Sequence, residues 1–88
     1  MIRRVSKLMA VPKYQLFVAF DDWKMVLYDV EEDMDTIPTY EPLRTIHGLF
    51  EQVRLDTSRT CIWWNDEIDL PSDAVYEFGT ELMPPRHG

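Results

Sequence analysis

The sequence predicts a single α+β domain, an antiparallel sheet of about five strands with two short helices in the order β-β-β-α-β-β-α. Two observations lead to this fold class. Short apolar segments rich in β-branched and aromatic residues alternate with polar turns, which is typical of hairpins or a meander. Two other segments carry proline near their start and glycine at their end, which is typical of short helices.

The length of the chain sets the size of the core. Its 88 residues are enough for one modest core and for no deep, dry cavity. We expect the folded domain to span residues 1–79. Residues 80–88 contain two prolines and no periodicity, so they are expected to form a flexible C-terminal tail.

Three strands are expected in the first third of the chain. Residues 3–11 form the first strand, which ends at a proline, and residues 14–20 and 25–30 form a hairpin around the polar stretch "DDWK". Trp23 occupies a position in this turn where glycine would relieve a positive φ angle. The charged residues 31–38 are expected to form a loop with at most one helical turn.

A short helix and a second hairpin are expected next. The helix lies within residues 39–48, because Pro42 suits its first turn and Gly48 suits its end. The hairpin joins residues 49–56 to residues 60–64 through a polar turn. The order of these elements places the hairpin between the two helices.

A second helix is expected within residues 71–79. A proline falls in its first turn, and Asp69 or Ser72 can cap its free N–H groups. Gly79 lies just past its end. The predicted buried face consists of Ala74, Val75 and Phe78.

Charge is distributed unevenly along the chain. The formal net charge is −7 and the isoelectric point is near 4.6, which disfavours direct binding to nucleic acid or to an anionic membrane. Residues 1–24 carry five basic and two acidic side chains, a net charge of +3. Residues 25–88 carry four basic and 14 acidic side chains, a net charge of −10. A basic partner would therefore meet the second part more favourably.

The single cysteine indicates a reducing compartment. Cys61 alone cannot form an intrachain disulfide or a multi-thiolate metal site, and we expect a buried, unreactive thiol. The apolar run near the N-terminus is too short for a signal peptide. No stretch approaches the roughly 18 apolar residues of a membrane span. We expect a cytoplasmic protein.

Four carboxylates are the best candidates for a metal site. They are Asp66, Glu67, Asp69 and Asp73. Their spacing lacks the glycine-containing turn of an EF-hand, and acids before a helix also complement its positive N-terminal end. His47 and His87 are the only histidines, and neither stands in a metal-binding pattern. We expect no metal, no cofactor and no catalytic residue.

The adjacent tryptophans point to an interaction surface. Successive strand residues face opposite sides, so Trp63 and Trp64 cannot both enter one core. The outward ring is either covered by the tail or a short helix, or left exposed as at protein interfaces. We expect the interaction surface to contain Trp23, Trp63, Asp66 and Glu67.

Three segments in order resemble a bacterial family known as domain of unknown function 2442. They are "YQLFVAFDDWKMVLYDV", "YEPLRTIHGLFEQVRLD" and "CIWWNDEIDLPSDAVYE". The family-like positions are Phe20, Asp29, Leu43, Phe50, Val53, Asp56, Ile62, Trp64, Asp69, Leu70 and Tyr76. Two positions depart from the family pattern, since Trp23 and Glu67 stand where it has turn glycines.

The resemblance implies a fold more than an activity. It implies a small α+β domain with an antiparallel sheet and short helices. Some members of the family carry a helix-turn-helix domain, and others are encoded beside a partner in what is suspected to be a toxin–antitoxin-like pair. We therefore expect a non-enzymatic protein-interaction domain. Its partner would be either the basic member of such a pair or a second copy of this chain in a homodimer. The alternative is a ligand- or metal-sensing domain that uses the acidic residues within 66–73.

Overall fold

A computed structural model describes residues 3–82 and confirms the α+β class. The strands are β1 (Val5–Val11), β2 (Gln15–Phe20), β3 (Met25–Asp29), β4 (Arg54–Leu55), β5 (Cys61–Asn65), β6 (Ile68–Pro71) and β7 (Thr80–Glu81). The helices are α1 (Val30–Thr36), α2 (Pro42–Thr45) and α3 (Ser72–Phe78), with single 3-10 turns η1 (Pro38–Tyr40) and η2 (Phe50–Gln52).

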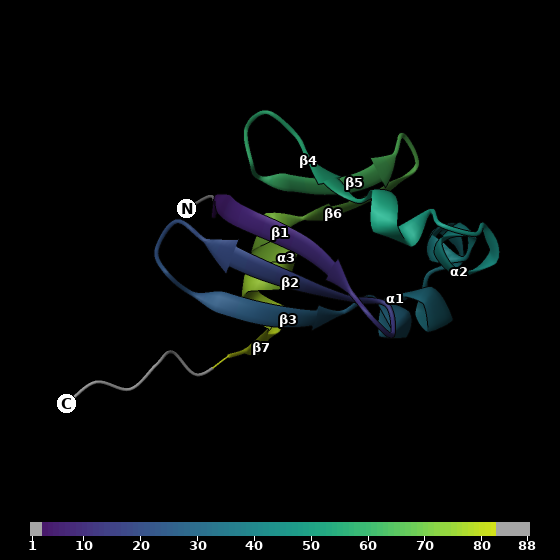
Figure 1. Ribbon diagram of the computed structural model, residues 1–88, viewed down its shortest axis with the longest axis horizontal. Helices are drawn as coiled ribbons and strands as arrows, with labels where there is room; N and C mark the ends of the chain where they lie inside the picture. Colours follow the sequence, from purple (N-terminus) through teal and green to yellow (C-terminus); the bar gives the residue numbers. More distant parts are fainter. Residues whose placement is uncertain (1–2, 83–88) are drawn as a thin grey trace.

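The strands form two antiparallel sheets. One has the order β1-β2-β3-β7 and the other the order β4-β5-β6. Figure 1 shows helix α3 behind the four-stranded sheet, with the three-stranded sheet alongside strand β1. No described element covers the front of the four-stranded sheet in this view. Helix α3 and the second sheet therefore cover one face of the four-stranded sheet, and the core lies on that side.

The core draws on both sheets and on α3. Alternate residues of β2 and β3 point into it, and Ile62, Trp64 and Leu70 enter from the second sheet, opposite Val75 of α3. The Nε1 of Trp64 donates a hydrogen bond of 3.0 Å to the carbonyl of Phe50, and the two rings stack 6.0 Å apart. Trp64 thus joins the second sheet to the segment that carries the short helices.

Trp23 adopts the positive φ angle that the sequence predicts. The N–H of Trp23 donates to the carbonyl of Phe20, and the N–H of Phe20 donates to the carbonyl of Lys24. This pattern is a three-residue hairpin loop whose last residue is left-handed, and Trp23 has φ 76°. A tryptophan therefore occupies a position that glycine fills at lower cost.

The charged segment after β3 is a helix and not the expected loop. The carboxylate of Asp29 accepts the N–H of Glu31 at 3.0 Å, which caps the first turn of α1. Val30 and Met34, four residues apart, are buried. The prediction was wrong because it weighed the acids as solvated loop residues and missed the cap and the apolar pair.

The second hairpin also differs from the expected one. Residues 50–52 form the turn η2, and only Arg54–Leu55 pair with β5. Strand β6 was missed. The side chain of Asn65 accepts the N–H groups of Glu67 and Ile68, so the turn into β6 closes without a glycine at Glu67.

The last helix lacks the predicted cap and part of its predicted buried face. Asp69 lies in β6 opposite Trp63, and the Ser72 hydroxyl donates to the carbonyl of Arg3, so neither side chain caps α3. Val75 is buried, but Phe78 is 74% exposed. The sheet continues to Glu81 through β7, whereas the residues of the expected tail from 83 onward lie outside the described part.

Arg59 connects the two sheets. Its backbone carbonyl accepts the N–H of Val5 at 2.8 Å, and its guanidinium donates to the carbonyl of Val5 at 3.1 Å. The same guanidinium forms two bonds of 2.9 Å to the carboxylate of Asp21. The turns of two separate hairpins are thereby held against the start of β1.

Trp23→Gly should raise the free energy of unfolding by about 0.5–1 kcal/mol. Glycine adopts the left-handed conformation without steric strain, and this gain exceeds the entropy that the more flexible unfolded chain loses on folding. Chemical denaturation of both proteins measures the difference. Trp23→Ala is the matched control, since it removes the same exposed ring but keeps Cβ, and it should give no gain. Equal effects of the two substitutions would contradict this account of the turn.

Asp21→Asn should flatten the loss of stability in acid. The hydrogen bonds from Arg59 lower the pKa of Asp21 below its ordinary value of 3.8. A carboxyl with a lowered folded pKa contributes stability above the unfolded pKa, and this contribution is lost as pH falls through the folded pKa. Unfolding followed between pH 5 and pH 2 therefore measures a shallower slope for the variant.

Arg59→Gln provides the control for this pH effect. It should flatten the acid slope as Asp21→Asn does, because it removes the partner that lowers the pKa. The double variant should be no flatter than either single variant. Additive flattening would show that the two side chains act independently.

Candidate protein-binding surface

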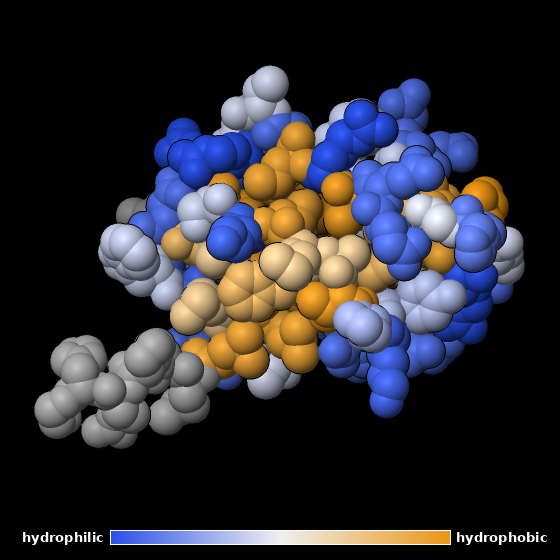
Figure 2. All heavy atoms as spheres, viewed as in Figure 1, coloured by the Kyte–Doolittle hydropathy of each residue, from blue (hydrophilic) through white to orange (hydrophobic). Residues whose placement is uncertain are grey.

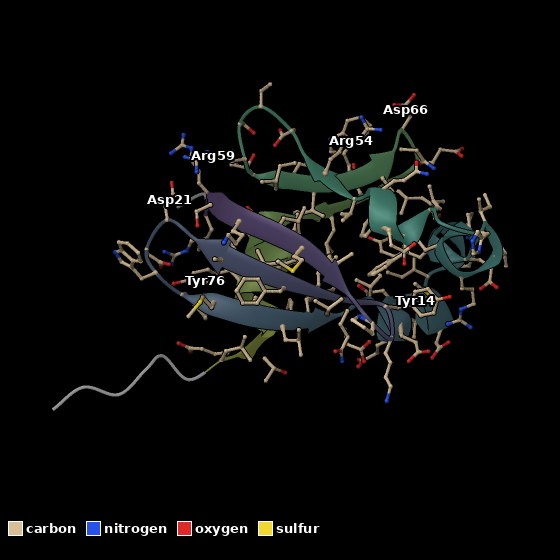
Figure 3. All side chains as sticks on the ribbon, in the orientation of Figure 1. Tyr14, Asp21, Arg54, Arg59, Asp66 and Tyr76 are labelled. Carbon is tan, nitrogen blue, oxygen red and sulfur yellow. The ribbon has the colours of Figure 1, made fainter. Side chains whose placement is uncertain are left out.

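The four residues of the predicted interaction surface do not lie together. Trp23 is 89% exposed in the turn between β2 and β3, whereas Asp66 and Glu67 are exposed in the turn between β5 and β6. Figure 3 shows Asp21, in the first of these turns, and Asp66 toward opposite ends of the molecule.

Of the two adjacent tryptophans, Trp64 is the buried one. Trp63 lies on the other face of β5, in a cross-strand row between Arg54 and Asp69. The guanidinium carbon of Arg54 stands 4.7 Å from the ring centroid of Trp63. The Nε1 of Trp63 is buried and has no hydrogen-bond partner among residues 3–82. Trp63 is therefore half-covered by this chain.

The family-like positions are mainly structural. Phe20, Leu43, Phe50 and Trp64 are buried. Asp29 caps α1, and Tyr76 lies edge-on to Phe20 at 4.9 Å between ring centroids. Asp69 contributes through its backbone, because its carbonyl accepts the hydroxyl of Tyr40 at 2.5 Å. None of these contacts by itself forms a binding site.

The acids near α3 do not converge. Asp69 faces outward from β6, and Asp73 accepts the backbone N–H of Arg3 at 3.1 Å. Within residues 3–82, no group of three or more His, Cys, Asp or Glu side chains is placed to hold a metal ion. Cys61 is only partly buried, not fully buried as expected, and this burial raises the pKa of its thiol, which favours the protonated form.

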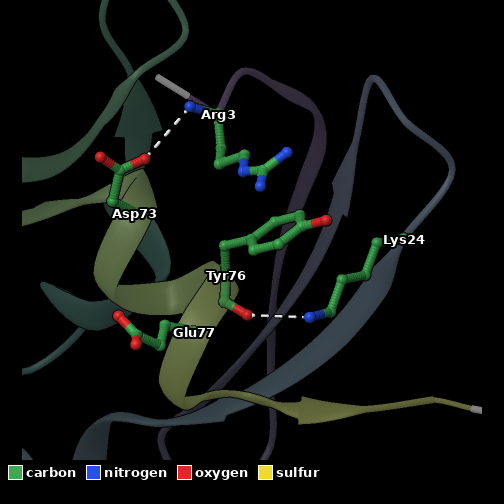
Figure 4. A pocket seen from close by; sticks show the side chains of 5 residues that line it. All are labelled: Arg3, Lys24, Asp73, Tyr76 and Glu77. Atoms are coloured by element: carbon green, nitrogen blue, oxygen red, sulfur yellow. Dashed lines mark hydrogen bonds between the residues drawn. The ribbon is translucent and has the colours of Figure 1, made fainter. Parts of the chain in front are cut away.

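A pocket of about 510 Å³ lies between α3 and the β2–β3 turn. Arg3, Lys24, Asp73, Tyr76 and Glu77 line it (Figure 4). The guanidinium carbon of Arg3 and the Nζ of Lys24 stand 4.2 and 4.1 Å from the centroid of the Tyr76 ring. Lys24 also donates to the carbonyl of Tyr76 at 3.1 Å. Lys24 thereby holds the end of the β2–β3 turn against α3, and Arg3 holds the start of the chain's described part against the same ring.

The open face of the four-stranded sheet is another candidate surface. Its side chains come from the alternate positions of β1, β2 and β3 that point away from the core. They are Lys7, Met9, Val11, Gln15, Phe17, Ala19, Met25, Leu27 and Asp29. Figure 2 shows apolar side chains gathered across this front surface, where Figure 1 shows the strands uncovered.

The open face is partly shielded by its own packing. Met9 is 51% exposed, while Phe17, Ala19, Met25 and Leu27 are each half-buried against their cross-strand neighbours. Leu82 extends the row at the far edge, since its N–H donates to the carbonyl of Met25 at 2.9 Å. A contiguous apolar surface of this kind is typical of an interface.

The sequence contains a signal for this face. Strands β2 and β3 are apolar at nearly every position, and a strand with one solvated face alternates instead. Phe17, Ala19 and Leu27 alternate with core residues and therefore lie on the face that the core does not use. Helix α3 covers only one face of the sheet, so these additional apolar residues predict that the other face is also buried, by a partner.

Finally, no described helix is both long enough and apolar enough to cross a membrane. Comparisons with protein-family models, with curated proteins and with solved structures find no match to this chain. The resemblance to the family named above stays a prediction, and the candidate surface rests on the residues of this chain alone.

Proposed function

We propose that this protein is a non-enzymatic protein-interaction domain of the cytoplasm, and that it binds through the open face of its four-stranded sheet. The observation that carries the proposal is the apolar row Met9, Phe17 and Leu27, which crosses three strands on the side that no described element covers. Covering such a row removes apolar area from water at about 25 cal/mol per Å².

The composition of the face supports protein binding. Aromatic residues and methionine are enriched at protein interfaces, and the face has Phe17 at its centre with Met9 and Met25 beside it. Methionine side chains adapt to the shape of a partner at low cost. Lys7 and Asp29 lie at its rim, where charged groups set orientation.

A basic protein is a second candidate partner, and one observation favours it. A hollow of about 540 Å³ lies where the open face ends near α1. Exposed Phe78 lines it together with Asp29 and Glu32, and Glu31 is exposed nearby. A partner with a basic rim would suit this end, as expected for the acidic member of a two-protein pair.

Photo-crosslinking from the face should capture a protein. Benzoyl-phenylalanine placed at Met9, which is exposed on the open face, should give a discrete crosslinked band in cells. The same group at Thr57, exposed in the β4–β5 loop away from the face, is the control. We expect at least a fivefold higher yield from position 9.

The possible results of this experiment separate the candidates. Equal yields from the two positions, or crosslinks within a single chain only, would contradict a binding role for the face. A basic partner should crosslink less when Glu32→Gln is added, since the hollow then loses charge. A partner that does not use the hollow should be unaffected by this change.

A further inference from the structure

We infer that the open face binds a second copy of this chain, face to face about a two-fold axis that runs diagonally across the strands. This inference rests on the proposed function, because it names the partner of the same surface. It depends on where the strand register places two opposite charges.

The register arranges the part of the face on β1, β2 and β3 as a grid of three strands by three rows, and β7 adds Thr80 beside Leu27 at its outer edge. The rows across β1, β2 and β3 are Lys7–Ala19–Met25, Met9–Phe17–Leu27 and Val11–Gln15–Asp29. Phe17 is at the centre. Lys7 and Asp29 occupy diagonally opposite corners, and both are exposed.

The two corner charges are available to a partner. Neither Lys7 nor Asp29 forms an ion pair with another residue in the range 3–82. One carboxylate oxygen of Asp29 accepts the N–H of Glu31, and its other oxygen forms no bond to these residues. The face itself carries one positive and one negative charge, so it is neutral although the chain is acidic.

Two identical faces can meet about four simple axes in the plane between them. An axis along the strands sets Lys7 on Met25, and an axis across the strands sets it on Val11. Both leave a charge buried against an apolar side chain, which is costly. The diagonal through the charged corners sets Lys7 on Lys7 and Asp29 on Asp29, which is repulsive.

The remaining diagonal axis is the one that pairs both charges with opposite charges. It sets Lys7 of each copy on Asp29 of the other, twice, and it sets the small Ala19 against the larger Leu27. Residues on the axis meet their own counterparts: Val11, Phe17 and Met25. Met9 meets Gln15. The strands of the two copies then cross at about 90°, which is one of the two usual sheet packings.

The size of the face indicates a weak dimer. Strands about 4.8 Å apart with about 3.3 Å per residue give a face of a few hundred Å², below the ~800 Å² per partner of a standard interface. The acids outside the face repel at long range, but a Debye length of about 8 Å at physiological salt screens most of this. Association should therefore depend on concentration.

Charge reversal at the corners tests the axis. Lys7→Glu sets a carboxylate on Asp29 at both corners, and Asp29→Lys sets an ammonium on Lys7, so each variant should dimerise at least tenfold more weakly than the wild type. An equal mixture of the two variants restores both opposite pairs, and it should sediment as a dimer. Analytical ultracentrifugation measures this for the 10.5 kDa chain.

Two further variants keep the test interpretable. Lys13→Glu makes the same change in net charge in the β1–β2 turn, outside the grid, and should dimerise like the wild type. Asp29 also caps α1, so the folding of Asp29→Lys is checked by circular dichroism. If it unfolds, Phe17→Asp replaces it. That variant sets two carboxylates on the axis and should be a monomer.

The overturning results are distinct from failure of the proposed function. A wild type that stays monomeric up to about 1 mM, or a Lys7→Glu variant that dimerises normally, overturns the second copy as partner. If position 9 then crosslinks to a different protein, the open face is still a binding surface. If it yields no intermolecular product, both proposals fail.

Discussion

Arg59 is the contact on which the arrangement of the two sheets depends. The three-stranded sheet has a first strand of only two residues, and a sheet this small is marginal by itself. Arg59 fixes it to β1 through its own carbonyl and through its guanidinium, which also holds Asp21. With the sheets held together at this edge, Ile62 and Trp64 can pack against the strands and against α3.

The position of α3 decides which surface is left for a partner. The helix covers the side of the sheet that bears Leu16, Val18 and Val26, and its C-terminus approaches the sheet closely at Gly79. A Cβ at Gly79 would stand 2.7 Å from the carbonyl of Val75, so a larger residue does not fit there. Helix α1 is as long as α3, but it follows β3 at the end of the strands and leaves the opposite side of the sheet uncovered (Figure 1).

The sequence predicted the regular parts of the fold better than the irregular ones. Strong apolar runs located β1, β2, β3 and β5, because a run of apolar, β-branched and aromatic residues is a local property of the sequence. Asp29 as a cap and Asn65 as a turn-former escaped notice, since each acts through one hydrogen bond that composition does not reveal. Asp69 was predicted to cap the last helix, yet it pairs with Trp63 in β6, a strand that was not predicted.

The candidate surface was harder to predict than the fold. Trp23 and Trp63 attracted notice as large aromatic residues, but a surface is defined by which side chains the register brings side by side. Phe17 and Leu27 become neighbours only through the pairing of β2 with β3. No spacing along the chain reveals that Lys7 and Asp29 stand at opposite corners.

An uncovered sheet face links folding to the amount of protein present. A partner that binds only the folded chain adds RT ln(1 + [L]/Kd) to its stability, and for a second copy that ligand is the protein itself. The free energy of unfolding of such a domain would then be smallest when the concentration of the protein is low. The fraction of folded chains would rise with expression, so abundance itself would act as a stabilising condition.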